Sequence, residues 1–357
     1  MKIKSILYFV GCVLMSSAAI LCVSVRAPLC FSADEAVVAA ASLTVSKGTN
    51  NSDIKLPKKK IIPKKNNSKP IPPPAETKPR SSDFSQSYYN TFTNHKDAKK
   101  LPVYTKQYTA GGKKYQNFYV KNNTSFDLNI GKSLTAPLGF KLEDTKDVQV
   151  LIYHTHTSES YLDCDVGYYY SDYYPRTSDT RYNVTAVGEE IAKSLRKAGI
   201  GVVHDTTVHD KAYTGSYMRS RKTVNAYIKK YPKIKVALDI HRDAIGDDNF
   251  KVKPTFTYKG KKGAQIMIMS GYDPDGFFDF PNWNYNLRFA LKLQQKCETN
   301  YSGMTRPLDF GNFAYNMNIN TGSLLVEFGT DSNTLAEAVY SGKLFGKALA
   351  QVLQNKT

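Results

Sequence analysis

The sequence predicts an α/β domain built on a twisted, largely parallel sheet flanked by helices. From residue 148 to the C-terminus, short apolar segments typical of buried strands alternate with longer amphipathic segments of helical period. This alternation is the pattern of a chain folded as consecutive β and α units. The 357 residues, 41% of them apolar, are enough for one such domain together with a long appendage.

The expected elements of this domain follow one another in order. We expect strands over 148–153, 201–204, 235–240, 265–269 and 323–328, and helices over 183–198, 216–230, 282–300 and 334–353. The helix over 183–198 has the clearest signals, because apolar residues recur at helical spacing from Val184 to Leu195 and Gly199 follows as a stop. Active sites of such sheets lie at the carboxyl ends of the strands.

Residues 1–30 are expected to form a membrane anchor. Lys2 and Lys4 precede an uncharged apolar stretch over 6–25, about the ~20 residues that cross a bilayer as a helix. Basic residues on the leading side keep that end cytoplasmic, so the rest of the chain is expected outside the cell membrane. Small residues at 16–18 also allow a cleaved signal peptide, but the apolar character continues to Val25 and favours an uncleaved anchor.

Residues 31–100 are predicted to form a disordered tether. The segment is rich in Lys, Pro, Ser and Asn, with a basic run at 58–65 and prolines at 70–74, and cannot bury enough apolar surface to fold. A formal charge of +18 calls for a polyanionic neighbour. Because the chain is expected to be exported, nucleic acid is excluded, and anionic lipid or an anionic wall polymer remains. A solvated spacer explains the tether equally well.

Residues 101–146 are predicted to form a small β-rich subdomain ahead of the main domain at 147–357. Short apolar and polar stretches alternate there, as over 115–120 and 126–130. The tyrosines of this segment could stack on sugars, but packing within strands explains them as well.

Titratable residues follow three of the predicted strands, at the edge where such sheets place their sites. They are His154, His156 and Glu159 after the first strand, His241, Arg242 and Asp243 after the third, and Glu327 in the last. A single histidine after a strand is usually structural. Two strand ends with histidines together with two carboxylates predict a metal site, because imidazole and carboxylate are the ligands of a catalytic zinc ion (Zn²⁺).

The sequence lacks the motifs of two other classes of enzyme. The sequence contains no glycine-rich phosphate loop and no nucleophile-elbow serine, so phosphoryl transfer and serine acyl transfer are not supported. His95, His204 and His209 are expected to be structural or exposed to solvent, since the first lies in the tether and the others flank a loop.

Three stretches around the titratable residues resemble the stage II sporulation protein P family. They are VLIYHTHTSESY at 150–161, LDIHRDA at 238–244 with the segment that precedes it, and LLVEFGTDSNTLAEA at 324–338. The resemblance extends over about residues 97–357, and the N-terminal anchor and linker fit the same arrangement. It implies a catalytic domain similar to the zinc-dependent N-acetylmuramoyl-L-alanine amidases.

The resemblance also implies roles for individual residues. One histidine of the first motif and His241 correspond to the zinc-binding histidines, and Glu327 corresponds to the catalytic glutamate. The amidases have a further glutamate ligand where this chain has residues 180–183, none of which is glutamate. Glu159 is therefore the candidate for the carboxylate ligand.

The choice between His154 and His156 stays open at this point. Residues two apart in an extended strand point to the same face, so both could approach one ion. The spacing in the amidases favours His156 slightly and leaves His154 beside the metal site or at the substrate. Arg242 could bind a carboxylate of the substrate or pair with Asp243.

The function implied by the resemblance is hydrolysis of peptidoglycan between the muramoyl lactyl group and L-alanine, with cross-link endopeptidase activity as an addition. It places the protein in septal wall thinning and engulfment during sporulation, with the stage II sporulation proteins D and M as partners. The catalytic domain would lie outside the cell membrane, in the septal space. Two alternatives remain: a noncatalytic scaffold that binds the wall, and a zinc peptidase that acts only on cross-links.

Overall fold

An eight-stranded mixed sheet forms the centre of residues 96–355, which are the part of the chain that this computed structural model describes. Its strands lie in the order β2 (Lys113–Tyr115), β3 (Phe118–Asn122), β11 (Leu308–Gly311), β10 (Ile266–Gly271), β12 (Ser323–Thr330), β7 (Val236–Asp243), β4 (Val148–Tyr153) and β6 (Gly201–His204). Strand β10 runs antiparallel to β12 and β2 antiparallel to β3, while the other neighbours are parallel. The predicted α/β class with a largely parallel sheet is confirmed.

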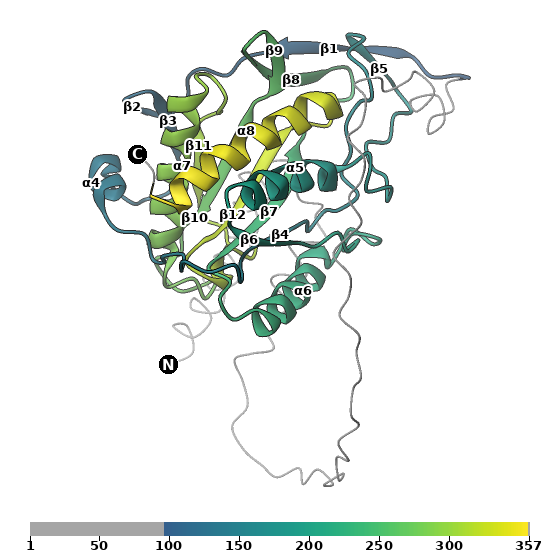
Figure 1. Ribbon diagram of the computed structural model, residues 1–357. Helices are drawn as coiled ribbons and strands as arrows, with labels where there is room; N and C mark the ends of the chain where they lie inside the picture. The colour runs from purple at the N-terminus through teal and green to yellow at the C-terminus, as the bar shows by residue number, and fades with distance from the viewer. Residues whose placement is uncertain (1–95, 356–357) are drawn as a thin grey trace, which may run out of the picture. The chain divides into compact units, whose positions relative to one another are not determined.

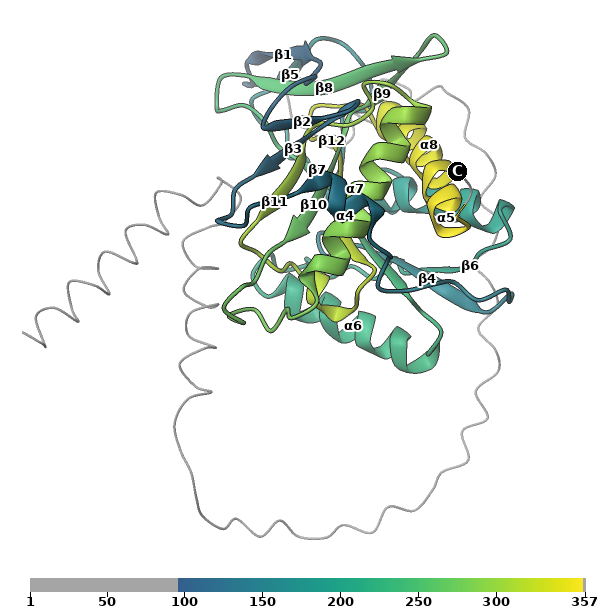
Figure 2. The same cartoon turned by 90° about the vertical axis from the view of Figure 1, so that its left-hand side faces the viewer.

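Helices cover both faces of this sheet, as Figures 1 and 2 show. One face carries α5 (Val184–Lys197), α7 (Trp283–Asn300) and α8 (Leu335–Leu353), and the other carries α6 (Ser216–Lys230). Two short helical segments, α4 (Ile130–Thr135) and η1 (Met317–Ile319), complete the set. In residues 96–355, no helix combines the length and the apolar character needed to cross a bilayer.

Helix starts follow from capping residues in the sequence. The side chain of Asn183 accepts a hydrogen bond from the backbone N–H of Thr185 and so begins α5. Thr334 and Glu337 form a reciprocal capping box at the start of α8. These caps satisfy backbone N–H groups that have no partner inside the helix, and they fix both helix starts beside the sheet.

A second sheet of four strands lies beside the main one, in the order β5 (Tyr168–Tyr170), β1 (Lys100–Lys106), β8 (Lys251–Tyr258) and β9 (Lys261–Ala264). Strands β8 and β9 form a hairpin whose turn residues, Lys259 and Gly260, both have positive φ. This geometry is typical of a tight two-residue turn that matches the twist of the strands. This hairpin was not predicted from the sequence.

The β content expected over 101–146 is present, but it forms no sheet of its own. Strand β1 joins the second sheet, while β2 and β3 extend the main sheet because β3 pairs with β11. Strands β1 and β3 therefore each pair with a strand far along the chain, and a separate subdomain does not form. The anchor over 1–30, all but the end of the tether over 31–100, and His95 lie outside the described residues.

Strand alternation sets the direction of the functional side chains. Ile240 and Val326 pack into the core beneath α5, α7 and α8, whereas Ala237 packs against α6. Because successive side chains in a strand point to opposite faces, His241 and Glu327 lie on the face that carries α6. The sheet thus brings these two residues to one face from neighbouring strands.

Helices α5 and α8 pack closely, which leads to a prediction about stability. A Cβ atom on Gly346 would lie 2.7 Å from Cβ of Ser194 and 3.0 Å from Cα of Ile191. We expect Gly346→Ala to lower the free energy of unfolding by about 1–3 kcal/mol through overpacking, although alanine favours a helix by about 1 kcal/mol over glycine. The exposed neighbour gives the control, since Lys347→Ala should stay within about 0.5 kcal/mol of wild type. Urea unfolding measures both, and a Gly346→Ala protein as stable as wild type would contradict the close packing.

Candidate active site

His156 lies in the loop after β4 and has a buried ring nitrogen without a partner. Its ring stacks on Tyr213, with ring centres 4.5 Å apart and an angle of 2° between the planes. It meets the ring of His241 edge-on, with centres 5.3 Å apart. Nδ1 of His156 is buried and has no hydrogen-bond partner among the described residues. Burial lowers the pKa of His156 to about 4, so the ring is neutral and can offer a lone pair.

His154 faces the other side of the sheet, toward α5, and both of its ring nitrogens are used. Nδ1 lies 2.9 Å from the carbonyl oxygen of Ile240, and Nε2 lies 2.9 Å from Nε2 of His204. Nδ1 of His204 in turn lies 3.1 Å from Glu189. Burial, and then the charge of His204, hold the pKa of His154 well below its usual range. His154 is thus a neutral residue in a buried hydrogen-bond chain.

His209 also belongs to the buried framework of this loop. Its Nδ1 donates to the backbone carbonyl of His154 at 2.8 Å, and its Nε2 lies 2.9 Å from the hydroxyl of Thr223 in α6. His204 and His209 are thus structural residues and are not exposed to solvent. Together they hold the backbone from which His156 projects.

His241 lies between two buried carboxylates. Its Nδ1 is 3.4 Å from Glu159, and its Nε2 is 2.8 Å from Oδ1 of Asp239. The second contact is an ion pair whose N–H group is not aligned for a hydrogen bond. Burial alone would lower the pKa of His241, but Asp239 and Glu159 raise it well above the usual range. Asp239 also accepts hydrogen bonds from the backbone N–H and the hydroxyl of Thr155, at 2.8 and 2.6 Å.

Asp239 and the two tyrosines beside His156 were not predicted from the sequence as site residues. Asp239 stands two residues before His241 in the same strand and so shares its face, which is a signal that the sequence contains. Tyr213 and Tyr217 lie before and at the start of α6, and both contact the ring of His156. Nothing in their spacing distinguishes them from ordinary tyrosines.

Glu159 is held as an ionised carboxylate. Its Oε2 accepts a hydrogen bond from the backbone N–H of Arg242 at 3.1 Å, and the guanidinium of Arg176 lies 3.8 Å from Oε1. Burial would raise the pKa of Glu159, but the Arg242 guanidinium and His241 outweigh it and hold the pKa well below the usual range. A buried anion therefore lies directly beside His241.

Arg242 differs from its expected role at the substrate. It is 7% exposed, and its guanidinium donates to the backbone carbonyls of Ser160 at 3.2 Å and Pro175 at 2.9 Å. Asp243, the alternative partner, pairs instead with Arg306 at 2.7 Å. Arg242 points inward because its donors satisfy one carbonyl in the loop after β4 and one in the loop after β5. It therefore positions these loops and Glu159 and does not face a ligand.

Glu327 lies opposite His241 in the register of β12 and β7. The residue is partly exposed, yet its Oε2 is buried and has no hydrogen-bond partner among the described residues. Burial raises the pKa of Glu327 to about 8; Asp243 and Glu159 add to the shift, while His241 opposes it. A carboxylate with a pKa near neutrality can both accept and donate a proton at physiological pH.

These residues fit a zinc ion by donor type. Within residues 96–355, no group of three or more His, Cys, Asp or Glu already has the arrangement of a metal centre. Yet His156 and Glu327 each present a buried polar atom without a hydrogen-bond partner among the described residues, and His241 faces only the carboxylates of Asp239 and Glu159 with its ring nitrogens. Two imidazoles with the carboxylate of Glu159 form a donor set that catalytic zinc takes, and Asp239 beside His241 is the kind of carboxylate that orients metal-binding histidines.

Comparison with known proteins shows the family of this chain. The model of the family described as "Stage II sporulation protein P" matches residues 39–352. The chain belongs to this family. It is 31% identical to the stage II sporulation protein P of Bacillus subtilis (strain 168) over 202 residues, which are 53% of this chain and 47% of that protein. The match thus spans about half of the relative's length.

Solved structures of amidases show weak similarity. The N-acetylmuramoyl-L-alanine amidase AmiC2 of Nostoc punctiforme is 12% identical, with a TM-score of 0.35 over 60% of this chain and 98% of that one. The CwlD amidase of Clostridioides difficile, solved in complex with the GerS lipoprotein, is 12% identical, with a TM-score of 0.34 over 58% of this chain and 97% of that one.

The burial of Glu327 leads to a prediction about stability in metal-free protein. Below pH 4.5 the carboxyl is protonated in both the folded and the unfolded state. Between 4.5 and about 8 the unfolded chain releases its proton while the folded protein keeps it, so wild type loses stability as the pH rises. Glu327→Gln has no such loss and should be more stable than wild type by a few kcal/mol at pH 8, but nearly equal at pH 4. Urea unfolding with a chelator present measures both, and a variant less stable than wild type at pH 8 would contradict this environment.

Proposed function

We propose that this protein is a zinc-dependent peptidoglycan hydrolase of sporulation, an N-acetylmuramoyl-L-alanine amidase. The observation that carries the proposal is the position of Glu327 opposite His241, with the ring of His156 beside His241 and buried atoms of Glu327 and His156 left without hydrogen-bond partners among the described residues. A buried polar atom that lacks a partner costs free energy, so several at one place indicate a site built to bind something. Membership of the stage II sporulation protein P family supports peptidoglycan as the substrate.

His156, His241 and Glu159 would hold the ion. Asp239 sits beside His241, and the backbone N–H of Arg242 fixes Glu159, so each of these two ligands has a neighbour that orients it. His154 stands behind the site because His204 and the Ile240 carbonyl engage both of its nitrogens. In this arrangement His156 is the ligand of the first motif and His154 positions the loop.

Glu327 would perform the proton transfers of amide hydrolysis. When bound, zinc lowers the pKa of a water from about 15.7 to roughly 7 and polarises the scissile carbonyl. Glu327 accepts the proton of the attacking water and then passes it to the leaving amine. Its position opposite His241 suits both steps, because a proton-transfer group must lie beside the atoms that react.

The wider biological role rests on the family. We propose that the protein thins the septal wall during engulfment, held at the cell membrane by residues 1–30 with its catalytic domain on the outer side. The stage II sporulation proteins D and M are its proposed partners. Cleavage of peptide cross-links is proposed as a second activity of the same site, because zinc and Glu327 would act on a peptide amide by the same chemistry.

Mass spectrometry of digested peptidoglycan tests the proposal. Full-length protein should release stem peptides and leave free lactyl ends, and a chelator should abolish the reaction. Glu327→Gln should lower the rate by about 10² to 10⁴-fold through loss of the proton acceptor, while Glu190→Gln on α5 should not change it. Split cross-links without free lactyl ends would make the protein an endopeptidase. No product at all, or activity that survives chelation, would reject the zinc amidase.

A further inference from the structure

Tyr217, the second residue of α6, stands beside both histidines of the candidate zinc site. Its ring meets the ring of His156 edge-on, with centres 5.5 Å apart and an angle of 87° between the planes. It lies nearly parallel to the ring of His241, with centres 6.5 Å apart and an angle of 12°. Tyr217 is partly exposed, so a ligand at the site can reach it. One tyrosine therefore borders both proposed imidazole ligands from the side of α6.

A strained loop fixes the position of Tyr217. Tyr315 and Asn316, between β11 and η1, both have positive φ, at 40° and 60°. Asparagine tolerates this conformation, but a tyrosine adopts it only where the surrounding structure imposes it. The side chain of Asn316 donates to the backbone carbonyl of Tyr217 at 3.0 Å, and the ring of Tyr315 lies 5.4 Å from that of Tyr217. Strain of this kind gathers at functional sites.

A hydrogen-bond chain connects this loop with the carboxylate beside His241. The side chain of Asn316 also donates to the hydroxyl of Ser220 at 3.0 Å, and that hydroxyl lies 2.7 Å from the hydroxyl of Thr155. Thr155 in turn donates to Oδ2 of Asp239 at 2.6 Å. The structure that positions the candidate ligands therefore also holds the loop that positions Tyr217.

The hydroxyl of Tyr217 is available as a hydrogen-bond donor. Within residues 96–355 it makes no hydrogen bond, although the backbone carbonyl of the same residue accepts two. Burial raises the pKa of Tyr217 well above its usual range, and the charge of Asp239 raises it further. Tyr315, Glu327 and Glu159 add to this shift. The hydroxyl therefore keeps its proton at neutral pH and lies among the carboxylates of the site.

The position of Tyr217 in its helix favours a negative charge nearby. It lies in the first turn of α6, where no side chain caps the helix and no residue is acidic. The N-terminal end of a helix carries a partial positive charge that stabilises an anion close to it. An oxygen that becomes negative beside Tyr217 would gain from this charge as well as from the hydroxyl.

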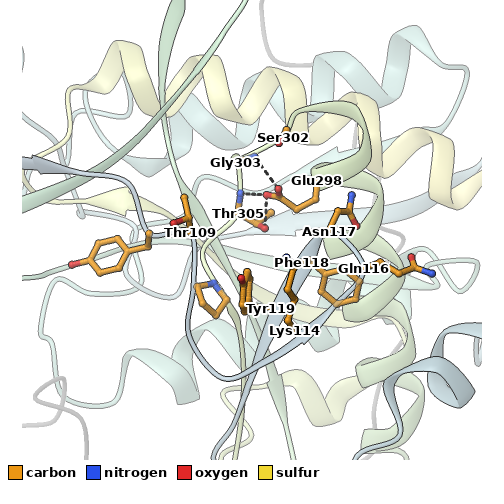
Figure 3. Close-up of a pocket in the computed structure, with 12 residues that line it drawn as sticks. Thr109, Lys114, Gln116, Asn117, Phe118, Tyr119, Glu298, Ser302, Gly303 and Thr305 are labelled. Carbon is orange, nitrogen blue, oxygen red and sulfur yellow. Dashed lines mark hydrogen bonds between the residues drawn. The ribbon is translucent and has the colours of Figure 1, made fainter.

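A cavity of about 310 Å³ at the edge of the main sheet differs from this site (Figure 3). Its acidic residue, Glu298, accepts hydrogen bonds from the N–H of Gly303 at 2.8 Å and from the N–H and hydroxyl of Thr305 at 2.6 and 2.7 Å. None of the candidate metal ligands lines this cavity. Glu298 is therefore a structural group of the loop from α7 to β11, whereas the hydroxyl of Tyr217 faces the site without a hydrogen-bond partner among the described residues.

We infer that Tyr217 is a catalytic residue. Its hydroxyl donates a hydrogen bond to the oxygen of the scissile carbonyl as that oxygen becomes negative. The inference rests on the proposed function, which brings the scissile amide to Glu327 and His241. Donors placed where charge develops lower the barrier because they need no reorganisation during the reaction.

Tyr217 keeps its proton throughout the reaction. The water oxygen forms a bond to the carbonyl carbon while Glu327 takes a proton from the water, and the π electron pair of the carbonyl moves onto its oxygen. The pair returns when the C–N bond breaks, and Glu327 gives its proton to the leaving amine. The hydrogen bond from Tyr217 is strongest at the tetrahedral stage between these steps.

Kinetics of Tyr217→Phe in the full-length, zinc-loaded protein test the inference. Phenylalanine keeps the ring and its packing and removes only the hydroxyl. We expect kcat for release of stem peptides to fall about 10²- to 10³-fold, with KM and zinc content as in wild type. Tyr285→Phe is the matched control, because this residue lies on α7 across the sheet and should change none of these quantities.

A second measurement needs no turnover. Calorimetry gives the Kd of a phosphinate analogue of the lactyl–alanine bond, whose tetrahedral oxygens imitate the negative oxygen. In Tyr217→Phe this Kd should rise by the same factor by which kcat falls, because the hydroxyl acts on the transition state and not on the bound substrate. N-acetylmuramoyl dipeptide, measured in Glu327→Gln to prevent cleavage, should bind equally with and without Tyr217→Phe.

Three results would overturn the inference. A kcat of Tyr217→Phe equal to that of wild type would show that the hydroxyl donates nothing to the reaction. Loss of zinc from Tyr217→Phe would make the residue a support of the metal ligands. Equal weakening of the phosphinate and the dipeptide would make it a residue of substrate binding. A wild-type protein that releases no product rejects the proposed function, whereas an active wild type matched by Tyr217→Phe rejects the inference alone.

Discussion

The buried carboxylate of Asp239 is the contact on which the candidate site depends. It accepts two hydrogen bonds from Thr155, the residue between His154 and His156, and it lies beside His241 in its own strand. One fully buried anion therefore fixes the loop after β4 against β7 and sets where both histidine-bearing segments meet. Burial of a charge is costly unless hydrogen bonds and opposite charge compensate it, so replacing any member of this group would disturb the others. Glu159 is a second buried carboxylate, on the other side of His241, and the charges of Arg242 and Arg176 compensate its burial.

Two layers of side chains follow from this arrangement. The outer layer consists of His156, His241, Glu159 and Glu327, and under the proposed function it supplies the metal ligands and the proton-transfer group. Behind it, His154, His204 and His209 form a buried hydrogen-bond framework against α5 and α6 that gives the loop a fixed shape.

Much of the fold could be predicted because periodicity is a local property. The strand over 148–153 and the helix over 216–230 have the bounds that the apolar pattern and flanking stops indicate. Pairing between distant segments is not local, which is why the β8–β9 hairpin and the joining of β3 to β11 were not predicted. In the site, the spacing in an extended strand could not separate His154 from His156. Strand β4 ends at Tyr153, and the bend that follows sends the two rings to opposite sides. The inward direction of Arg242 likewise depends on the backbone carbonyls of Ser160 and Pro175. Both lie in loops whose conformation cannot be predicted from a local sequence pattern.

Metal analysis of full-length protein with single histidine replacements tests the central claim most directly. The measurement is the zinc content of His154→Ala, His156→Ala and His241→Ala, prepared in parallel with wild type. We expect His156→Ala and His241→Ala to lose the ion, because each removes a ligand, while His154→Ala binds it about 10- to 100-fold more weakly through a disturbed loop. Anomalous diffraction at the zinc edge should place the ion between His156 and His241. A full equivalent of tightly bound zinc in His156→Ala, together with an empty site in His154→Ala, would contradict the assignment and exchange the roles of the two histidines.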